Sequence, residues 1–171
     1  MVLSFNRIGH EEIAMGMNAE QFRQYVIRPA LVWLGMDSPA AEALLLGTAA
    51  QESGLGCYLR QVGGGPALGV FQMEPATYRD IWSRFVATRP EIAGRLASRW
   101  PQTPEPEAMV TDLFLAAVMC RLHYRRVTAP LPEADDIAGL AAYWKRHYNT
   151  PAGAGSEAEF LRNWRRLCVG G

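Results

Sequence analysis

The sequence predicts a mainly α-helical, α+β type of domain with one small β element near the middle of the chain. Along most of the 171 residues, apolar side chains recur at intervals of three and four, which is the period of an amphipathic helix. Capping signals precede several of these segments. With 49% hydrophobic and 20% charged residues and no internal repeat, the chain has the composition and length of one globular domain.

The first helix is expected to begin at Asn18, whose side chain can cap it while Gln21 completes a capping box. Residues 1–17 lack a strong helical period, so we expect a poorly structured extension followed by a single folded domain over residues 18–171. Pro29 interrupts the helical pattern, which predicts a kink or a restart before residues 31–35. The buried stripe of this helix should comprise Phe22, Tyr25 and Val26.

The second helix should begin after Ser38, because Asp37 and Ser38 are good N-cap residues and Pro39 suits the first helical turn. It should run to about Glu52 and is apolar nearly all round, which is typical of a central buried helix. Several glycines at positions 54–65 then break the chain into a loop. Residues 67–73 are the best candidate for a short β element.

The second half of the chain predicts further helices. They should resume after Pro75 and after Pro90, with a proline-rich connection over residues 100–106 and a long helix from about residue 109. Asp135 or Asp136 should cap the next helix, and a capping box at Ser156 should start the last. The expected inward-facing residues are Tyr78, Ile81, Trp82, Phe85, Ile92, Leu96, Met109, Leu113, Ala116, Ala117, Cys120, Tyr124, Ile137, Leu140, Ala141, Trp144, Phe160, Trp164 and Leu167.

Composition argues against several classes of function. Seventeen basic and seventeen acidic residues give no net charge, which disfavours a dedicated nucleic-acid binder. No window reaches the ~18 consecutive apolar residues of a membrane span, and the first residues lack the apolar run of a secretion signal. The three histidines and three cysteines lack ligand spacing, so we expect free thiols, no metal and no cofactor.

Glu52 is the candidate for chemistry. It ends the apolar helix and is followed by Ser53 and Gly54, which should place its carboxyl at the wall of the core beside a loop. Partial desolvation and the negative end of the helix dipole should both raise its pKa, and a carboxyl that stays protonated near neutral pH suits a general acid. The helical period alone favours an ordinary glutamate in the last turn that points into solvent.

Three motifs carry a family resemblance. Residues 50–54 read AQESG, residues 69–77 read GVFQMEPAT, and residues 147–153 read HYNTPAG. In this order, and after an apolar helix, they resemble the lysozyme-like superfamily, specifically lytic transglycosylases of the soluble type. The third motif matches more weakly, with residues inserted. The compact chain also resembles small phage or prophage proteins of this superfamily.

The resemblance implies roles for individual residues. It implies that Glu52 is the catalytic acid, that Ser53 and Gln72 lie beside the glycan, and that Tyr148 lies near the acid, with Asn149 beside it in the same motif. Glu74 departs from the transglycosylase pattern and matches an acidic position of goose-type lysozymes. It is therefore a candidate second catalytic carboxylate, although a helix-start charge before Pro75 explains it equally well.

The resemblance implies cleavage of the bond between N-acetylmuramic acid and N-acetylglucosamine in the glycan strands of bacterial peptidoglycan. A lytic transglycosylase is favoured over a hydrolytic muramidase. The alternative is a non-catalytic lysozyme-like module that binds the wall or belongs to a virion, because fold does not fix function. The protein would be made in the bacterial cytoplasm and reach the wall after release, as an endolysin does, or within a virion. The oligomeric state is left open.

Overall fold

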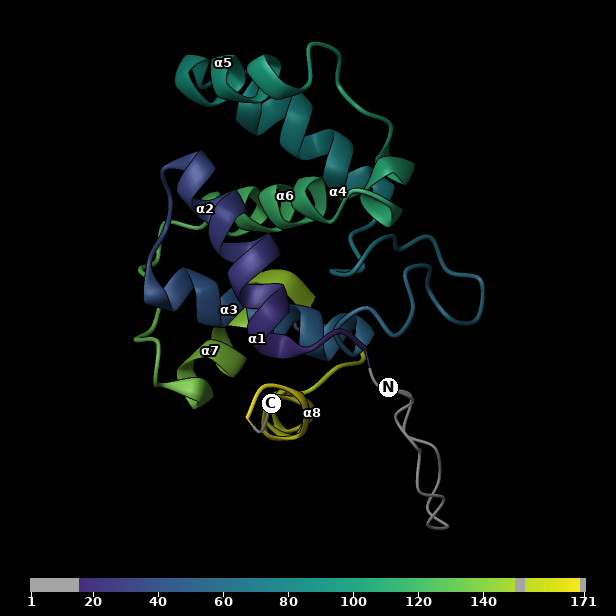
Figure 1. The fold of residues 1–171 in the computed structure, drawn as a ribbon, viewed down its shortest axis with the longest axis vertical. Coiled ribbons are helices and arrows are strands. Elements are labelled where there is room, and N and C mark those ends of the chain that lie inside the picture. Colours follow the sequence, from purple (N-terminus) through teal and green to yellow (C-terminus); the bar gives the residue numbers. More distant parts are fainter. Residues whose placement is uncertain (1–15, 150–152, 170–171) are drawn as a thin grey trace, which may run out of the picture.

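The structure is a computed structural model that describes residues 16–149 and 153–169, and it confirms a mainly helical fold. Figure 1 shows α5 at one end of the molecule and α8 at the other, with α6 and α3 between them. The elements are α1 (Ala19–Phe22), η1 (Arg23–Ile27), α2 (Arg28–Leu34), α3 (Pro39–Ser53), α4 (Pro75–Asp80), η2 (Ile81–Val86), α5 (Pro90–Arg99), η3 (Pro106–Val110), α6 (Leu113–Arg125), α7 (Ile137–Trp144), η4 (Lys145–Asn149) and α8 (Glu157–Leu167).

The first helical stretch begins where the sequence predicts, but one of its predicted core residues is wrong. Asn18 caps α1, and its side chain accepts from the Gln21 N–H at 3.0 Å. The π-helical turn η1 then changes the helical phase, so Tyr25 is 67% exposed and Ile27 is buried in its place. Pro29 stands in the first turn of α2, which is the predicted restart.

The central helix α3 is confirmed from cap to end. The Ser38 hydroxyl caps it, Pro39 is its first residue, and most of its middle is buried against α6, α7, α8 and η1. Gly47 permits the closest of these contacts, because a Cβ at this position would lie 2.3 Å from the Phe160 ring of α8. The helix therefore holds its last turn, which contains Glu52, in a fixed place within the core.

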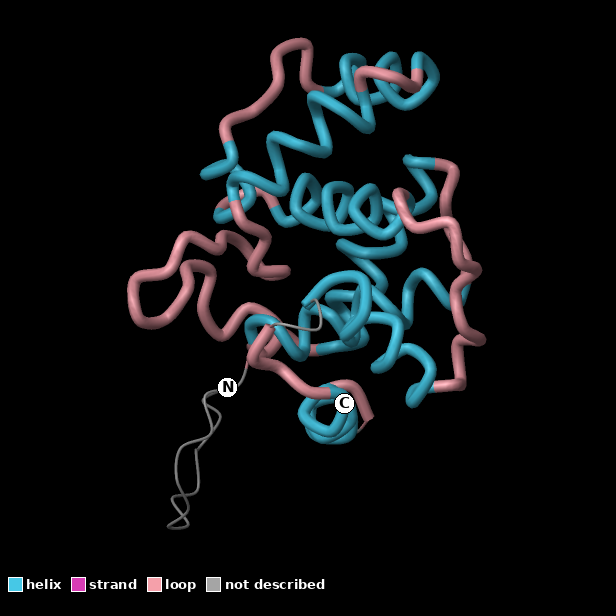
Figure 2. Tube along the Cα trace, turned by 180° about the vertical axis from the view of Figure 1, so that it is seen from behind, coloured by secondary structure: helices cyan, strands magenta, loops and turns pink. Residues whose placement is uncertain are grey.

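The predicted β element over residues 67–73 is reduced to two isolated bridges, and the described residues contain no strand. Leu68 bridges both Arg60 and Met73, and the Leu68 and Met73 backbones exchange two hydrogen bonds of 3.0 Å. Between them, Gly69 (φ 73°) and Gln72 (φ 47°) adopt left-handed conformations that a strand does not allow. We call residues 68–73 the site turn; it belongs to the long pink loop that projects from the helices in Figure 2.

The later helices follow the predicted order. Asp136 caps α7 and the Ser156–Glu159 capping box starts α8, both as predicted. Met109 is buried but lies in η3, because the long helix α6 begins only after its own cap, Asp112. Six of the inward-facing residues expected in this half of the chain are only partly buried: Trp82, Ile92, Leu113, Ile137, Trp164 and Leu167.

Two composition-based expectations can be compared with the described residues. All three cysteines are free, with Cys120 buried and Cys57 exposed. Across residues 16–149 and 153–169, no helix has both the length and the apolar character needed to cross a membrane.

The packed part of the chain begins slightly earlier than predicted. The Met17 N–H donates to the Leu55 carbonyl at 2.8 Å, and Gly16 lies so close to Gly54 that a Cβ would be 2.1 Å from its carbonyl oxygen. The rest of the predicted extension, residues 1–15, lies outside the described residues.

A chain that begins at Met17 is expected to melt within a few degrees of the full chain. It keeps the Asn18 cap, and its terminal ammonium can still donate to the Leu55 carbonyl. Thermal unfolding followed by circular dichroism measures this. A large drop in melting temperature would show that residues 1–16 contribute to the core.

Candidate active site

A cavity of about 690 Å³ brings the end of α3, the site turn and the η4 segment together. We call it the cleft. Five of the residues singled out from the sequence line it: Glu52, Gln72, Glu74, Tyr148 and Asn149. They come from three parts of the chain that are far apart in sequence. The remaining lining includes Tyr58, His123, Trp144 and the backbone of residues 153–155.

Glu52 is held by a donor that the sequence motifs do not reveal. Its Oε1 accepts a hydrogen bond of 2.8 Å from the Trp144 indole N–H, and Trp144 itself is fully buried. Burial raises the pKa of Glu52 to about 7, and the indole N–H partly offsets this. In the protonated form Oε1 remains the acceptor, which favours the acidic proton on Oε2. The carboxyl is therefore both oriented and available as an acid near neutral pH.

Ser53 has a structural position and does not line the cleft. It is fully buried, and its hydroxyl donates to the Val70 carbonyl at 2.6 Å. The same oxygen accepts from the Gly56 N–H at 2.8 Å. These bonds tie the end of α3 to the loop and to the site turn. Ser53 is therefore buried behind the cleft and does not lie where the resemblance implied, beside a bound glycan. Its hydroxyl fixes the backbone next to Glu52.

Gln72 presents an acceptor without a partner. Its side chain is buried at the base of the cleft, and its Nε2 donates to the Gly69 carbonyl at 2.8 Å, within the site turn. That bond fixes the orientation of the amide, and Oε1 is buried with no partner among the described residues. A buried acceptor left unpaired costs roughly 1–3 kcal/mol.

Tyr148 and Asn149 lie in η4, the π-helical continuation of α7. The Tyr148 hydroxyl donates to the Phe71 carbonyl in the site turn at 2.8 Å. Asn149 Oδ1 accepts from Lys145 Nζ at 2.8 Å, and the same ammonium donates to the Gly153 carbonyl. Residues 150–152 of the third motif lie outside the described residues.

Glu74 lies at the rim of the cleft and also at the start of a helix. It is exposed, occupies the N-cap position of α4, and makes no side-chain bond to the helix N–H groups. Both interpretations from the sequence therefore stay open: a second carboxylate that faces the substrate, or a charge stabilised by the helix dipole.

Three cleft residues were missed by the sequence reasoning. Trp144 was expected as a core residue, and the structure shows that its N–H also donates to Glu52, 92 positions away in the sequence. The Tyr58 hydroxyl donates to the Glu52 carbonyl at 2.8 Å and closes the last turn of α3. His123 lies at the wall with its pKa lowered by burial to about 4, so it is neutral at physiological pH. Of these three residues, only Trp144 could have been found from the sequence, because it lies four positions before Tyr148 and residues at this spacing share one face of a helix.

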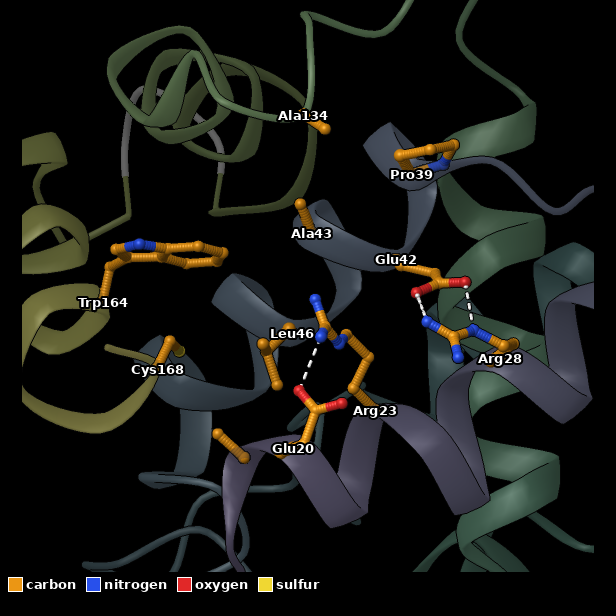
Figure 3. A pocket seen from close by; sticks show the side chains of 11 residues that line it. Glu20, Arg23, Arg28, Pro39, Glu42, Ala43, Leu46, Ala134, Trp164 and Cys168 are labelled. Carbon is orange, nitrogen blue, oxygen red and sulfur yellow. Dashed lines mark hydrogen bonds and ion pairs between the residues drawn. The ribbon is translucent and has the colours of Figure 1, made fainter. Parts of the chain in front are cut away.

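A second cavity, of about 420 Å³, lies between α1, η1, α3 and α8 and is shown in Figure 3. Its acidic residues both form ion pairs with arginines that also line it. Arg28 donates to both oxygens of Glu42 at 2.7 and 2.9 Å, and Arg23 pairs with Glu20 at 2.5 Å. Both carboxylates of this cavity therefore have an arginine partner, whereas the Glu52 carboxyl is held by the neutral indole of Trp144.

Comparisons with protein-family models, with curated proteins and with solved structures found no match. Among residues 16–149 and 153–169 there is also no cluster of three or more histidine, cysteine, aspartate or glutamate side chains placed to hold a metal ion.

Proposed function

We propose that this protein is a glycosidase that cleaves the β-1,4 bond between N-acetylmuramic acid and N-acetylglucosamine in peptidoglycan. One observation carries the proposal: in a cleft open to solvent, the desolvated Glu52 carboxyl has a pKa of about 7 and is oriented by Trp144. A carboxyl with these properties suits protonation of a departing glycosidic oxygen. The sequence motifs around Glu52 and Gln72 add the substrate class.

The reaction begins with proton transfer from Glu52 to the bridging oxygen. The C1–O bond breaks as the proton arrives, and C1 gains oxocarbenium character. In the transglycosylase route the substrate's own acetamido oxygen assists at C1. The carboxylate of Glu52 then takes the proton of the muramic 6-hydroxyl, whose oxygen attacks C1. The product is a 1,6-anhydromuramic end, and the proton is back on Glu52.

The other cleft residues would orient the sugar. Gln72 lines the cleft with its amide fixed by the Gly69 carbonyl, and its buried Oε1 can accept from an acetamido N–H, which every sugar of this polymer carries, once the side chain shifts toward the cleft. Tyr148 and Asn149 also line the cleft, and the Tyr148 hydroxyl is bonded to the Phe71 carbonyl beside Gln72. We further propose that the enzyme acts on the wall after release from a bacterial cell or as a component of a virion, in line with the resemblance of the compact chain to small phage or prophage proteins.

Zymography tests the proposal. The purified protein is run in a gel that contains peptidoglycan and then renatured, and a cleared band is expected. Absence of clearing, together with binding to sedimented peptidoglycan, would support the non-catalytic module instead.

Glu74→Gln distinguishes the two routes. In the single-acid route that we favour, the substitution should change turnover less than about threefold, because a helix-start charge contributes under ~1 kcal/mol. Mass spectra of the wild-type digest should then show anhydromuramic ends, lighter by one water. A severe loss of turnover with fully hydrated products would instead assign Glu74 as the base of a hydrolytic muramidase.

A further inference from the structure

A network of three side chains links the end of α4 to the cleft through the last turn of α6. Arg126 donates from Nη1 to Asp80 at 2.8 Å and from Nη2 to His123 Nδ1 at 2.9 Å. His123 Nε2 lies 2.8 Å from the carbonyl oxygen of His147 in η4. A guanidinium only donates, so Nδ1 must accept, and the ring proton is on Nε2 and is donated to the carbonyl.

The ring of His123 also contacts Tyr148. Its centroid lies 4.8 Å from that of Tyr148 in an edge-on arrangement, and Tyr124 packs on Tyr148 at 5.3 Å. The Tyr148 hydroxyl is in turn bonded to the Phe71 carbonyl, next to Gln72. His123 therefore contacts η4 twice, once at the backbone of His147 and once at the side chain of Tyr148.

The His147 carbonyl lies in the π-helical segment η4. π-helical turns are short features that packing must support. The core residues predicted for α7 end at Trp144. The position of η4 therefore depends on contacts with residues from other elements of the fold. His123 supplies one of them from α6.

We propose that His123 is a positioning residue: it holds η4 against the cleft and so places Tyr148 and Asn149 where they contact the glycan. The inference rests on the proposed function and adds a residue to it that none of the three motifs contains. The groups that face His123 are Arg126, the His147 backbone, Tyr124 and Tyr148. Burial, which is the largest cause, and the charges of Arg126 and of the His147 side chain lower the pKa of His123 to about 4, although the bond to the His147 carbonyl raises it. The ring is therefore neutral at physiological pH, and the required tautomer persists there.

Two substitutions test the inference. His123→Phe keeps the aromatic contact with Tyr148 but removes both ring nitrogens. In His123→Gln, the amide Nε2 lies about as far from the backbone as the imidazole Nε2 does, so it can still donate to the His147 carbonyl. For soluble glycan strands we expect KM to rise about tenfold in His123→Phe, as for the loss of one hydrogen bond, and to return within about threefold of wild type in His123→Gln.

The split between KM and kcat separates positioning from stability. Partial unfolding reduces the amount of active enzyme, which lowers apparent kcat and leaves KM unchanged. A displaced η4 raises KM, while the alkaline fall of the rate, which reports Glu52, stays where it is. An unchanged KM in His123→Phe would overturn the inference, whatever happens to the melting temperature.

Amide hydrogen exchange gives a readout that does not need activity. In His123→Phe the amides of residues 145–149 should exchange about tenfold faster, with protection restored in His123→Gln and unchanged in α3. Unchanged exchange in η4 would overturn the inference. An inactive wild-type protein would overturn the proposed function, and the exchange data would still decide whether His123 holds η4.

Discussion

Glu52→Gln is expected to reduce cleavage of peptidoglycan at least about 10²-fold, the lower end of what general acid catalysis contributes. The amide cannot give up a proton, but its Oε1 can still accept from the Trp144 indole, so the local packing is kept. Turbidity clearance of purified peptidoglycan measures the loss. Glu133→Gln, the same change at an exposed loop position, is the matched control and should be fully active. Near-normal clearance by Glu52→Gln would refute the assignment of the acid.

The same substitution should stabilise the protein at high pH. Burial raises the pKa of Glu52 in the folded state from the ordinary range of a glutamate to about 7, so the folded state holds the proton more tightly. The stability that this provides is complete below the unfolded pKa and is lost as pH rises through 7. Above pH 7 the wild type carries a buried carboxylate, and Glu52→Gln should be more stable by up to about 3 kcal/mol.

Urea unfolding at pH 8 and at pH 4 measures this difference. The gap in unfolding free energy between Glu52→Gln and wild type should be large at pH 8 and small at pH 4. A gap that does not depend on pH would show that Glu52 titrates in its ordinary range.

Gly69→Ala should cause the largest loss of stability among substitutions in the site turn. Gly69 has φ 73°, and an added Cβ would lie 2.5 Å from the Met109 carbonyl oxygen. The left-handed conformation costs roughly 1–2 kcal/mol for a residue with a Cβ, and overpacking adds roughly 1–3 kcal/mol. Because Gln72 is bonded to the Gly69 carbonyl, the cleft should also be disturbed and activity lost.

Gly63→Ala is the control that separates the conformational cost of this substitution from its steric cost. Gly63 has a similar φ of 87°, but no atom lies within 4 Å of an added Cβ. Only the conformational cost of roughly 1–2 kcal/mol is then expected. Urea midpoints of the two variants give the difference, and equal losses would show that Gly69 has no close contact with η3.

The parts of the fold that the sequence predicted depend on short patterns. The caps at Asn18, Ser38, Asp136 and Ser156 each join residues three positions apart, and the caps fix the starts of four helices. The π-helical turns were not predictable in this way, because they arise where packing shifts the hydrogen-bond pattern. Tyr25 is exposed for this reason.

The site was predictable only where a motif contained it. The motifs indicated Glu52, Gln72 and Tyr148, and the structure places all three on one cleft. They could not indicate the indole donor, which comes from a distant helix, or the buried bonds of Ser53 to Val70 and Gly56. The apolar pattern of residues 67–73 favoured a strand, but the chain forms a turn there, and Gln72 has a positive φ in that turn.

The rate of product release from purified peptidoglycan between pH 5 and pH 9 tests the central claim most directly. If Glu52 must be protonated to donate to the glycosidic oxygen, the rate should fall tenfold per pH unit above a midpoint near 7, where Glu52 loses its proton. Release of soluble glycan fragments with this profile is the predicted result. No release at any pH, or a rate that stays constant up to pH 9, would contradict the role assigned to Glu52.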